Sequence, residues 1–206
     1  MDDLYFDSEY AEHSDYNGLS SLYDYNAKPV KITDQSIEKV KTVSLKGYTD
    51  NQLENLKESH KIILEVAKDQ NNHNEVARIA KINGDDSVLI LGDSNKVLFN
   101  DNLDARRIII MSPVNSIVVS HNHPNCTTFS YDDLEVMLNS SVKTLTIVTN
   151  KGKVLALNKT KIVDGREVVG YIDSVKQKYS DFKKDQPKIV EEILKGLGDF
   201  GIEYIK

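Results

Sequence analysis

The segment that most constrains the fold of this 206-residue chain runs from residue 114 to residue 138. It holds an apolar β-branched run, Ile117-Val118-Val119, which predicts a buried strand over residues 114–120. His121-Asn122-His123-Pro124 follows directly, and the proline prevents the strand from continuing. A helical pattern then covers residues 130–138. A buried strand, a polar loop and a helix in this order are typical of a layered α/β domain.

Two histidines and one carboxylate in this segment have the spacing of a metal site. Side chains two residues apart in a strand share a face, so His121 and His123 project together if the strand continues through them. Ser130 can cap the following helix, and Asp133 then lies in its first turn. Two imidazoles and one carboxylate leave the fourth tetrahedral position of a zinc ion open, as in catalytic zinc sites. These residues make the chain a candidate metallohydrolase.

The same residues resemble the JAMM motif of the JAB/MPN metalloprotease family. That motif is His-x-His-Pro followed by Ser-x-x-Asp, with a glutamate upstream, and His-Asn-His-Pro is most similar to the RadC branch and to JAB-type domains of bacteria and their phages. The resemblance covers roughly residues 50–160. It implies a cytidine-deaminase-like layered α/β fold, in which helices flank a mixed sheet.

Carried over to this chain, the resemblance implies that His121, His123 and Asp133 bind zinc. It implies that Ser130 hydrogen-bonds the oxyanion of the tetrahedral intermediate and that the upstream glutamate is the general base. We assign that glutamate to Glu75, at the start of a predicted strand that follows a helix. The implied activity is hydrolysis of a peptide or isopeptide bond in a protein or peptide substrate, with ubiquitin-like conjugates as one option.

Neighbouring acidic residues compete for these roles. Asp132 stands next to Asp133 and is the alternative carboxylate ligand. Glu65 and Asp69 are alternatives to Glu75 as the general base. The sequence leaves these choices open.

The loop after the second histidine departs from the family pattern, with six residues before the serine where the family usually has seven. Cys126 lies in this loop, where it either binds or blocks the metal or is a passive loop residue. The other histidines stand outside the motif. His73 is expected to face solvent, and His13 and His60 have no motif around them.

Helix and strand patterns continue on both sides of the motif. Thr49 and Gln52 have capping-box spacing, and an apolar helical stripe extends from there to about residue 69. Two strand-like runs, residues 75–82 and 87–91, flank a hairpin turn. We further expect a short strand over 96–99, an ambiguous segment over 103–111, a hairpin of strands over 145–149 and 154–157, and helices over 166–182 and 187–197, with Pro187 at the first helical position of the last.

These patterns divide the chain into three parts. We expect an α/β domain over residues 49–160, a helical extension over 161–206 and a tail over 1–48. The first 27 residues hold seven acidic residues and no lysine or arginine, and we expect the tail to be disordered. The same stretch has five tyrosines, which favour an alternative reading as a docking peptide for a basic partner.

Composition excludes several classes of protein. The net charge is −6, but the chain beyond residue 27 carries only +1, so no basic surplus supports nucleic-acid binding. No apolar run approaches the roughly 20 residues that span a bilayer, and the acidic start is unlike a secretory signal. The single cysteine fits a reducing compartment, so we expect a cytoplasmic protein. The rivals to an enzyme are a non-catalytic interaction module on the same fold and a RadC-like nucleic-acid-associated protein.

Overall fold

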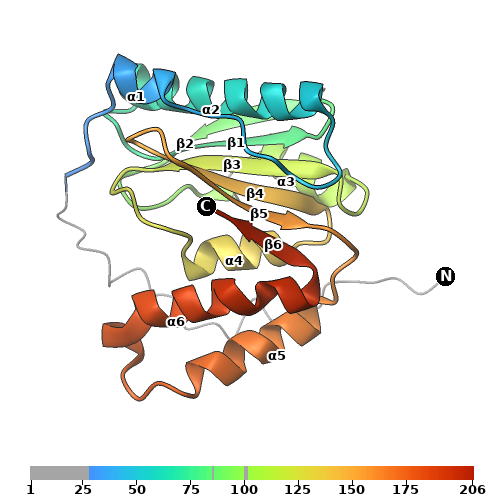
Figure 1. Ribbon diagram of the computed structural model, residues 1–206. Helices are drawn as coiled ribbons and strands as arrows, with labels where there is room; N and C mark the ends of the chain where they lie inside the picture. Colours follow the sequence, from blue (N-terminus) through green and yellow to red (C-terminus); the bar gives the residue numbers. More distant parts are fainter. Residues whose placement is uncertain (1–27, 85, 100–101) are drawn as a thin grey trace.

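The structure is a computed structural model that describes residues 28–84, 86–99 and 102–206 (Figure 1). Its centre is one six-stranded sheet with the strand order β2-β1-β3-β4-β5-β6. The strands are β1 (Val76–Lys81), β2 (Ser87–Leu91), β3 (Ile117–His123), β4 (Val142–Thr149), β5 (Val154–Lys159) and β6 (Ile202–Ile205). Strands β3 and β4 pair in parallel and the other neighbours pair antiparallel, so the sheet is mixed.

Helices cover both faces of this sheet, as Figure 1 shows. One face carries α1 (Asp34–Glu38) and α2 (Asp50–Gln70), and the other carries α4 (Tyr131–Leu138), α5 (Gly165–Lys176) and α6 (Phe182–Gly196). Helix α3 (Leu103–Met111) contacts β1 and β2, and a short 3₁₀-helix, η5 (Leu197–Phe200), leads into β6. The predicted layered α/β architecture, with helices flanking a mixed sheet, is confirmed. Within the described ranges, no helix combines the length and the apolar character needed to cross a bilayer.

The long helix α2 forms where the capping box predicts it. Thr49 Oγ1 accepts the N–H of Gln52, and the Gln52 side chain accepts the N–H of Thr49. Leu56, Ile63 and Leu64 form the buried stripe that packs this helix onto the sheet. The helix therefore follows from its cap and its apolar period, both of which are visible in the sequence.

Strands β1 to β5 agree with the predicted strands except at some boundaries and over residues 96–99. Both predicted hairpins form, since β1 pairs with β2 and β4 pairs with β5. Strand β3 begins at Ile117, later than predicted, and continues through His123. No strand forms over residues 96–99, and the ambiguous segment 103–111 is helix α3. Pro187 lies inside α6 on its exposed side, not at its first position, because the helix already begins after a cap at Asp181.

The structure corrects the boundary of the predicted tail. Residues 28–48 pack onto the α2 side of the sheet, where Ile32, Ile37 and Val40 are buried in one apolar cluster. Because these side chains belong to the core, the folded domain begins upstream of residue 49. The acidic part of the predicted tail, residues 1–27, lies outside the described residues.

The predicted C-terminal extension, residues 161–206, also needs correction. Strand β6 pairs with β5 and so belongs to the central sheet. Ile189 and Ile193 of α6 are fully buried in the same apolar cluster as Leu145 and Leu157 of the sheet. The C-terminal segment is therefore part of the domain core and not an appendage to it.

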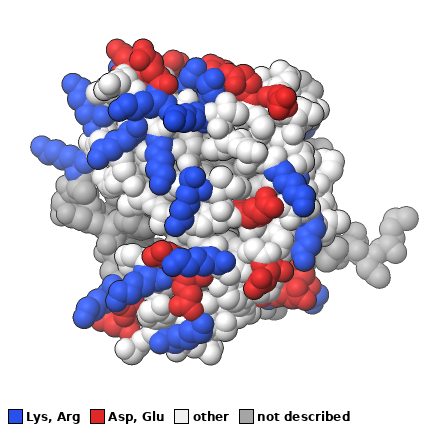
Figure 2. All heavy atoms as spheres, viewed as in Figure 1, with Lys and Arg blue, Asp and Glu red and all other residues white. Residues whose placement is uncertain are grey.

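The surface carries both signs of charge. On the face drawn in Figure 2, basic side chains gather mainly on the left, whereas acidic ones lie along the top and in the lower part. This mixture agrees with the near-neutral charge of the chain beyond residue 27. The face does not present the single-sign field with which proteins bind nucleic acids.

We predict that Ile32→Ala lowers the free energy of unfolding by about 2–4 kcal/mol, because truncation of this fully buried side chain leaves a cavity. Lys31→Ala is the matched control, since Lys31 is the exposed neighbour and its change should stay within about 0.5 kcal/mol. Urea unfolding followed by circular dichroism measures both. Equally small effects in the two variants would show that residues 28–48 do not belong to the core.

Candidate metal centre

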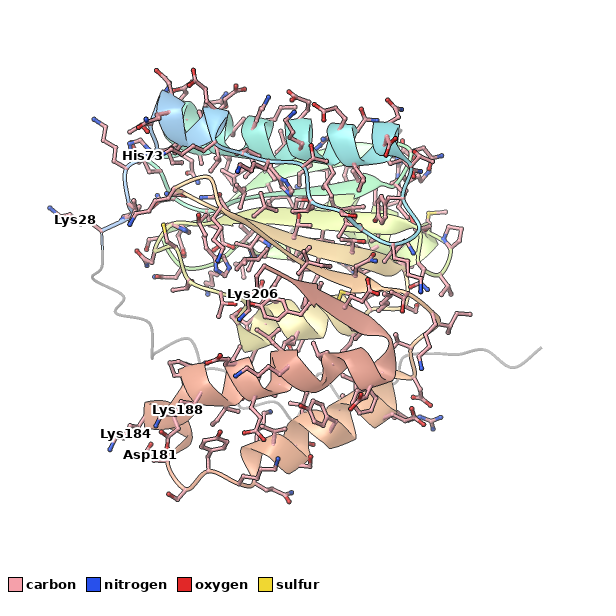
Figure 3. The ribbon with its side chains drawn as sticks, in the orientation of Figure 1. Lys28, His73, Asp181, Lys184, Lys188 and Lys206 are labelled. Carbon is pink, nitrogen blue, oxygen red and sulfur yellow. The ribbon has the colours of Figure 1, made fainter. Side chains whose placement is uncertain are left out.

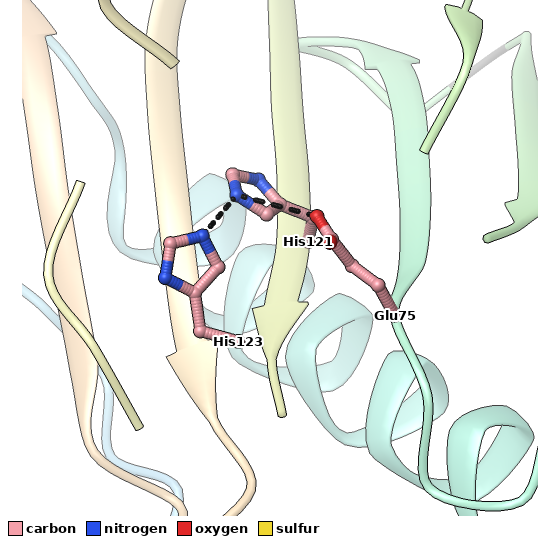
Figure 4. Close-up of side chains that lie close together, drawn as sticks. All are labelled: Glu75, His121 and His123. Atoms are coloured by element: carbon pink, nitrogen blue, oxygen red, sulfur yellow. Dashed lines mark hydrogen bonds and ion pairs between the residues drawn. The ribbon is translucent and has the colours of Figure 1, made fainter. Parts of the chain in front are cut away.

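His121 and His123 lie at the end of β3, on the face of the sheet that α4 covers. Strand alternation places both imidazoles on the same side as the core residue Val119. Their Nε2 atoms are only 2.9 Å apart, and both side chains are buried (Figure 4). The strand persists this far because β4 pairs with it in parallel up to His123 and Thr149. The predicted convergence of the two histidines is therefore present.

Asp133 reaches the two histidines from the first turn of α4. Ser130 caps this helix, and its N–H and Oγ–H donate to Asp133 Oδ2 at 2.6 and 2.7 Å. The N–H of Asp133 donates back to Ser130 Oγ at 3.2 Å, which completes a capping box. The carboxylate held in this way lies 2.9 Å from His121 Nε2 and 3.5 Å from His123 Nε2.

Glu75 approaches the same histidines from the residue before β1. Its N–H donates to the carbonyl of Asp93, and its own carbonyl accepts from the N–H of Gly92. These two bonds fix the backbone, and the buried carboxylate points toward His121, with Oε1 3.8 Å from Nε2 (Figure 4). The bonds to Gly92 and Asp93, which directly follow β2, thus direct this glutamate toward the end of β3.

Together, Glu75, His121 and His123 form a buried group that could hold a metal ion. One potential ligand atom from each residue lies within 4.8 Å of the other two. The Asp133 carboxylate contacts both histidines, so it adds a second carboxylate to the same cluster. Asp133 itself is not part of the group that lies within 4.8 Å, so the structure brings two imidazoles and the Glu75 carboxylate together and sets the Asp133 carboxylate beside the histidines.

The ring orientations suit metal binding. His123 Nδ1 lies 2.9 Å from Thr127 Oγ1 and 3.3 Å from the Thr127 carbonyl oxygen. Because a carbonyl only accepts hydrogen bonds, we assign the ring proton to Nδ1, which leaves the lone pair of Nε2 facing the cluster. His121 Nδ1 is buried and has no hydrogen-bond partner in the described part of the chain, so its Nε2 is also the atom that meets the cluster.

The two carboxyl groups of the cluster have pKa values shifted in opposite directions. Burial raises the pKa of Glu75 to about 7, although the charges of His121 and His123 oppose the rise. Burial also favours a higher pKa for Asp133, but the charges and hydrogen bonds of the two histidines hold that pKa well below its usual range. Burial works to lower the pKa of His121, yet the Asp133 carboxylate outweighs it and raises that pKa. One carboxyl group therefore titrates near neutrality while the other stays ionised, a division found in acid–base sites.

The cluster lies in the wall of a pocket of about 400 Å³. The segment from Ser94 to Phe99, helix α4 and the loop after His123 all contribute to the lining of the pocket. Val97, Leu98 and Phe99 give it an apolar part beside the polar residues of the cluster. A pocket of this size and composition is suited to a small molecule or to a short stretch of peptide.

No protein-family model, curated protein or solved structure matches this chain. What can be said of the site therefore comes from its own residues and their geometry. The resemblance to the JAB/MPN family stays a prediction from the sequence motif.

Within the described residues, none of the acidic competitors forms an ion pair with the histidines. Asp132 lines the same pocket but is exposed on α4, whereas Asp133 beside it is buried. Glu65 and Asp69 are exposed on α2, which covers the opposite face of the sheet. Of the glutamates considered for the base, Glu75 is the one that the fold brings to the cluster.

Ser130 and Cys126 both come from the segment after His123, and the Ser130 side chain contacts a residue of the candidate metal centre. The Ser130 hydroxyl donates to Asp133, so in this structure it positions a carboxylate, and its contact with an oxyanion stays a prediction. Cys126 is half-buried in the loop with a left-handed backbone, φ 57°. Its sulfur is not part of the potential metal-binding group.

Two of the remaining histidines, His73 and His60, serve the fold. His73 is half-buried beside the segment that leads into α1, where its Nδ1 accepts the N–H of Ile32 (Figure 3). His60 lies on the buried side of α2 and is fully buried; it hydrogen-bonds Thr146 Oγ1 at 2.7 Å, and burial lowers its pKa to about 3. His13 lies outside the described residues.

Sequence reasoning missed Asn122, the residue between the two histidines. Asn122 is fully buried on the α2 face, and its Oδ1 accepts the N–H of Val76 at 2.7 Å. Its Nδ2 donates to the Asn74 carbonyl at 3.1 Å and to Asn150 Oδ1 at 2.7 Å. These bonds hold the backbone on both sides of Glu75. The signal in the sequence is an amide inside a strand of buried residues, which needs partners for both of its polar atoms.

We predict that Asn122→Ala lowers the free energy of unfolding by about 1–3 kcal/mol, because it leaves the buried N–H of Val76 without an acceptor. The amide of Val76 should also exchange with solvent faster, which NMR hydrogen exchange measures directly. Asn51→Ala, at an exposed position of α2, is the control and should change neither quantity appreciably. Unchanged protection of Val76 in Asn122→Ala would show that the amide does not position this segment.

Proposed function

We propose that this protein is a zinc-dependent hydrolase that cleaves a peptide or isopeptide bond. The observation that carries the proposal is the convergence of His121 Nε2, His123 Nε2 and the Asp133 carboxylate over distances of 2.9–3.5 Å. The carboxyl group of Glu75, with its raised pKa, lies beside them. All four residues line the same pocket, so a substrate in that pocket would meet them.

Zinc fits this set of donors better than the other common divalent ions. Imidazole nitrogen and carboxylate oxygen are ordinary zinc ligands, and three protein ligands leave one position for the reaction. Calcium and magnesium prefer oxygen ligands, so the two imidazoles of His121 and His123 argue against them. The Nδ1 contact of His123 with Thr127 supplies the outer hydrogen bond that usually orients a ligating histidine.

The residues around the ion divide the work between them. When bound, zinc would polarise the scissile carbonyl and lower the pKa of water toward about 7. Glu75 would take a proton from the attacking water and return it to the leaving amine; its position beside His121 and the burial that raises its pKa both support this role. Asp133 stays ionised, which offsets the charge of the ion and keeps the two histidines oriented.

Ser130 would contribute to the reaction in two ways, by supporting Asp133 and by donating a hydrogen bond to the oxyanion. Its backbone N–H donates to Asp133 independently of its hydroxyl, so the carboxylate keeps one support if the hydroxyl turns away. The hydroxyl lines the pocket and could then donate to the oxyanion that forms from the scissile carbonyl. Ser130 would therefore both position a ligand and stabilise the transition state.

The substrate class follows from the scissile bond and the pocket. Peptide and isopeptide bonds are both amides, so the same residues would serve either. The apolar side chains Val97, Leu98 and Phe99 give a substrate side chain a surface to pack on. A protein or peptide substrate, with ubiquitin-like conjugates included, agrees with both features.

We predict that the purified protein binds about one zinc ion per chain and that His121→Ala combined with His123→Ala abolishes binding. Asp133→Asn should weaken zinc binding about tenfold or more, because it removes a charged contact with both histidines. Asp132→Asn is the matched control and should bind like the unmodified protein, since Asp132 is exposed. Plasma mass spectrometry and competition with a chelator measure these quantities. A chain that holds no zinc after incubation with a zinc salt would leave the interaction module as the better reading.

We predict that Glu75→Gln lowers kcat/KM about 10²–10⁴-fold. Zinc content and unfolding should stay close to those of the unmodified protein, because the proposed ligands are His121, His123 and Asp133. Loss of zinc would instead make Glu75 a ligand, as its place in the potential metal-binding group also allows. The amide keeps the size of the side chain but cannot accept and return the proton. Glu65→Gln, at an exposed position on α2, is the control and should retain activity. A fluorogenic peptide library and an isopeptide-linked ubiquitin dimer are the substrates for this assay. Hydrolysis that survives in Glu75→Gln would assign the base to another group.

A further inference from the structure

A second pocket, of about 350 Å³, lies on the face of the sheet opposite the metal centre. It is enclosed by α2, by β1 and β3 and by the turn between β1 and β2. Its wall includes Tyr48, Leu56, Ser59, Arg78, Val118 and Ser120. The proposed hydrolase leaves this pocket without a role.

Arg78 brings a positive charge into this pocket. It projects from β1 toward α2 and is half-buried, and its strand neighbour on β3 is Ser120. Two hydroxyl groups hold the guanidinium plane: Nη1 donates to Ser59 Oγ at 2.8 Å and Nη2 donates to Ser87 Oγ at 3.1 Å. These contacts fix the direction of the side chain without neutralising its charge.

No carboxylate in the described ranges forms an ion pair with Arg78. The charged residues of the same pocket wall are engaged elsewhere, since Glu58 pairs with Lys61 and Lys81 pairs with Asp86. Removal of a charge from water is costly unless a counter-charge replaces the lost solvation. A half-buried guanidinium held only by neutral hydroxyls therefore has unused capacity to bind an anion.

The surrounding hydroxyls add hydrogen-bond donors. Ser120 Oγ accepts from Thr146 Oγ1, so its own proton remains for another acceptor in the pocket. Ser59 Oγ accepts from Arg78, so its proton also remains. The guanidinium has five N–H groups, of which two serve these serine contacts. Donors thus outnumber acceptors at this end of the pocket, which is the pattern of an oxyanion site.

We propose that this pocket binds a small molecule through a carboxylate or phosphate group held by Arg78, Ser59 and Ser120. Leu56, Ile62 and Val118 also line the pocket and give an apolar surface for the body of the ligand. A volume of about 350 Å³ is in the range of small-molecule sites. Because this pocket and the metal centre lie on opposite faces of the sheet, the ligand here is not the hydrolase substrate.

The test is an NMR titration of the full chain with inorganic phosphate and, separately, with acetate, at constant ionic strength. We expect saturable shifts of the amides of Ser59, Arg78 and Ser120 with at least one of the two anions. A preference for phosphate would indicate a phosphorylated ligand, and a preference for acetate a carboxylic acid. No saturable shift with either anion would overturn the proposal. So would shifts confined to Ser130 and Asp133, which would place the anion at the metal centre instead.

Substitutions of Arg78 provide a second test of the same proposal. Arg78→Gln should weaken binding about tenfold or more, because it removes the charge and the paired N–H donors. Arg78→Lys keeps the charge but lacks the planar pair of N–H donors. Its affinity for the anion should therefore lie between those of the unmodified protein and Arg78→Gln. Arg106→Gln, at an exposed position of α3, is the matched control and should bind like the unmodified protein. Equal binding by all four proteins would also overturn the proposal, whereas poor folding of Arg78→Gln would leave the titration of the unmodified chain as the deciding measurement.

Discussion

The arrangement around the candidate site depends on the hydrogen bonds of the buried Asn122 side chain. Pairing between β1 and β3 stops at Ala77 and His121, and beyond that point the Asn122 amide takes over by accepting the N–H of Val76. The same amide binds Asn150, which in turn donates to the carbonyls of Val30 and His73. One buried side chain therefore ties together the start of β1, the end of β4 and the N-terminal segment. The two histidines on either side of it are held by the same framework.

Alternation along β3 explains why much of the site could be predicted from sequence. A two-residue period puts His121 and His123 on one face, and it puts Ser120 and Asn122 on the other. The capping pattern that starts at Ser130 fixed the helix that brings a carboxylate to the histidines. Short-range rules of this kind act between residues that are close in the chain, so they can be read without knowing the fold.

The parts that could not be predicted depend on contacts between distant segments. Ile32, Ile37 and Val40 do not form a sustained helical or strand period, so the local pattern is too short to mark residues 28–48 as core. Strand β6 is only four residues long and becomes a strand because β5 offers it an edge. The role of Asn122 likewise appears only when β1 and β4 are placed beside it. In each case the partner lies dozens of residues away, where period and propensity carry no information.

The two carboxyl groups of the site show how environment assigns chemistry to similar side chains. Asp133 and Glu75 are both buried, and burial alone would raise the pKa of each. Asp133 lies 2.9 Å from His121 and 3.5 Å from His123, and the charges and hydrogen bonds of these imidazoles stabilise its charged form. Glu75 lies 3.8 Å from the same imidazole, beyond hydrogen-bond distance, so burial dominates and its pKa reaches about 7. A difference of about one ångström in the distance to His121, together with the hydrogen bonds that the shorter distance allows, thus separates a carboxyl group that stays ionised from one able to exchange protons near neutrality.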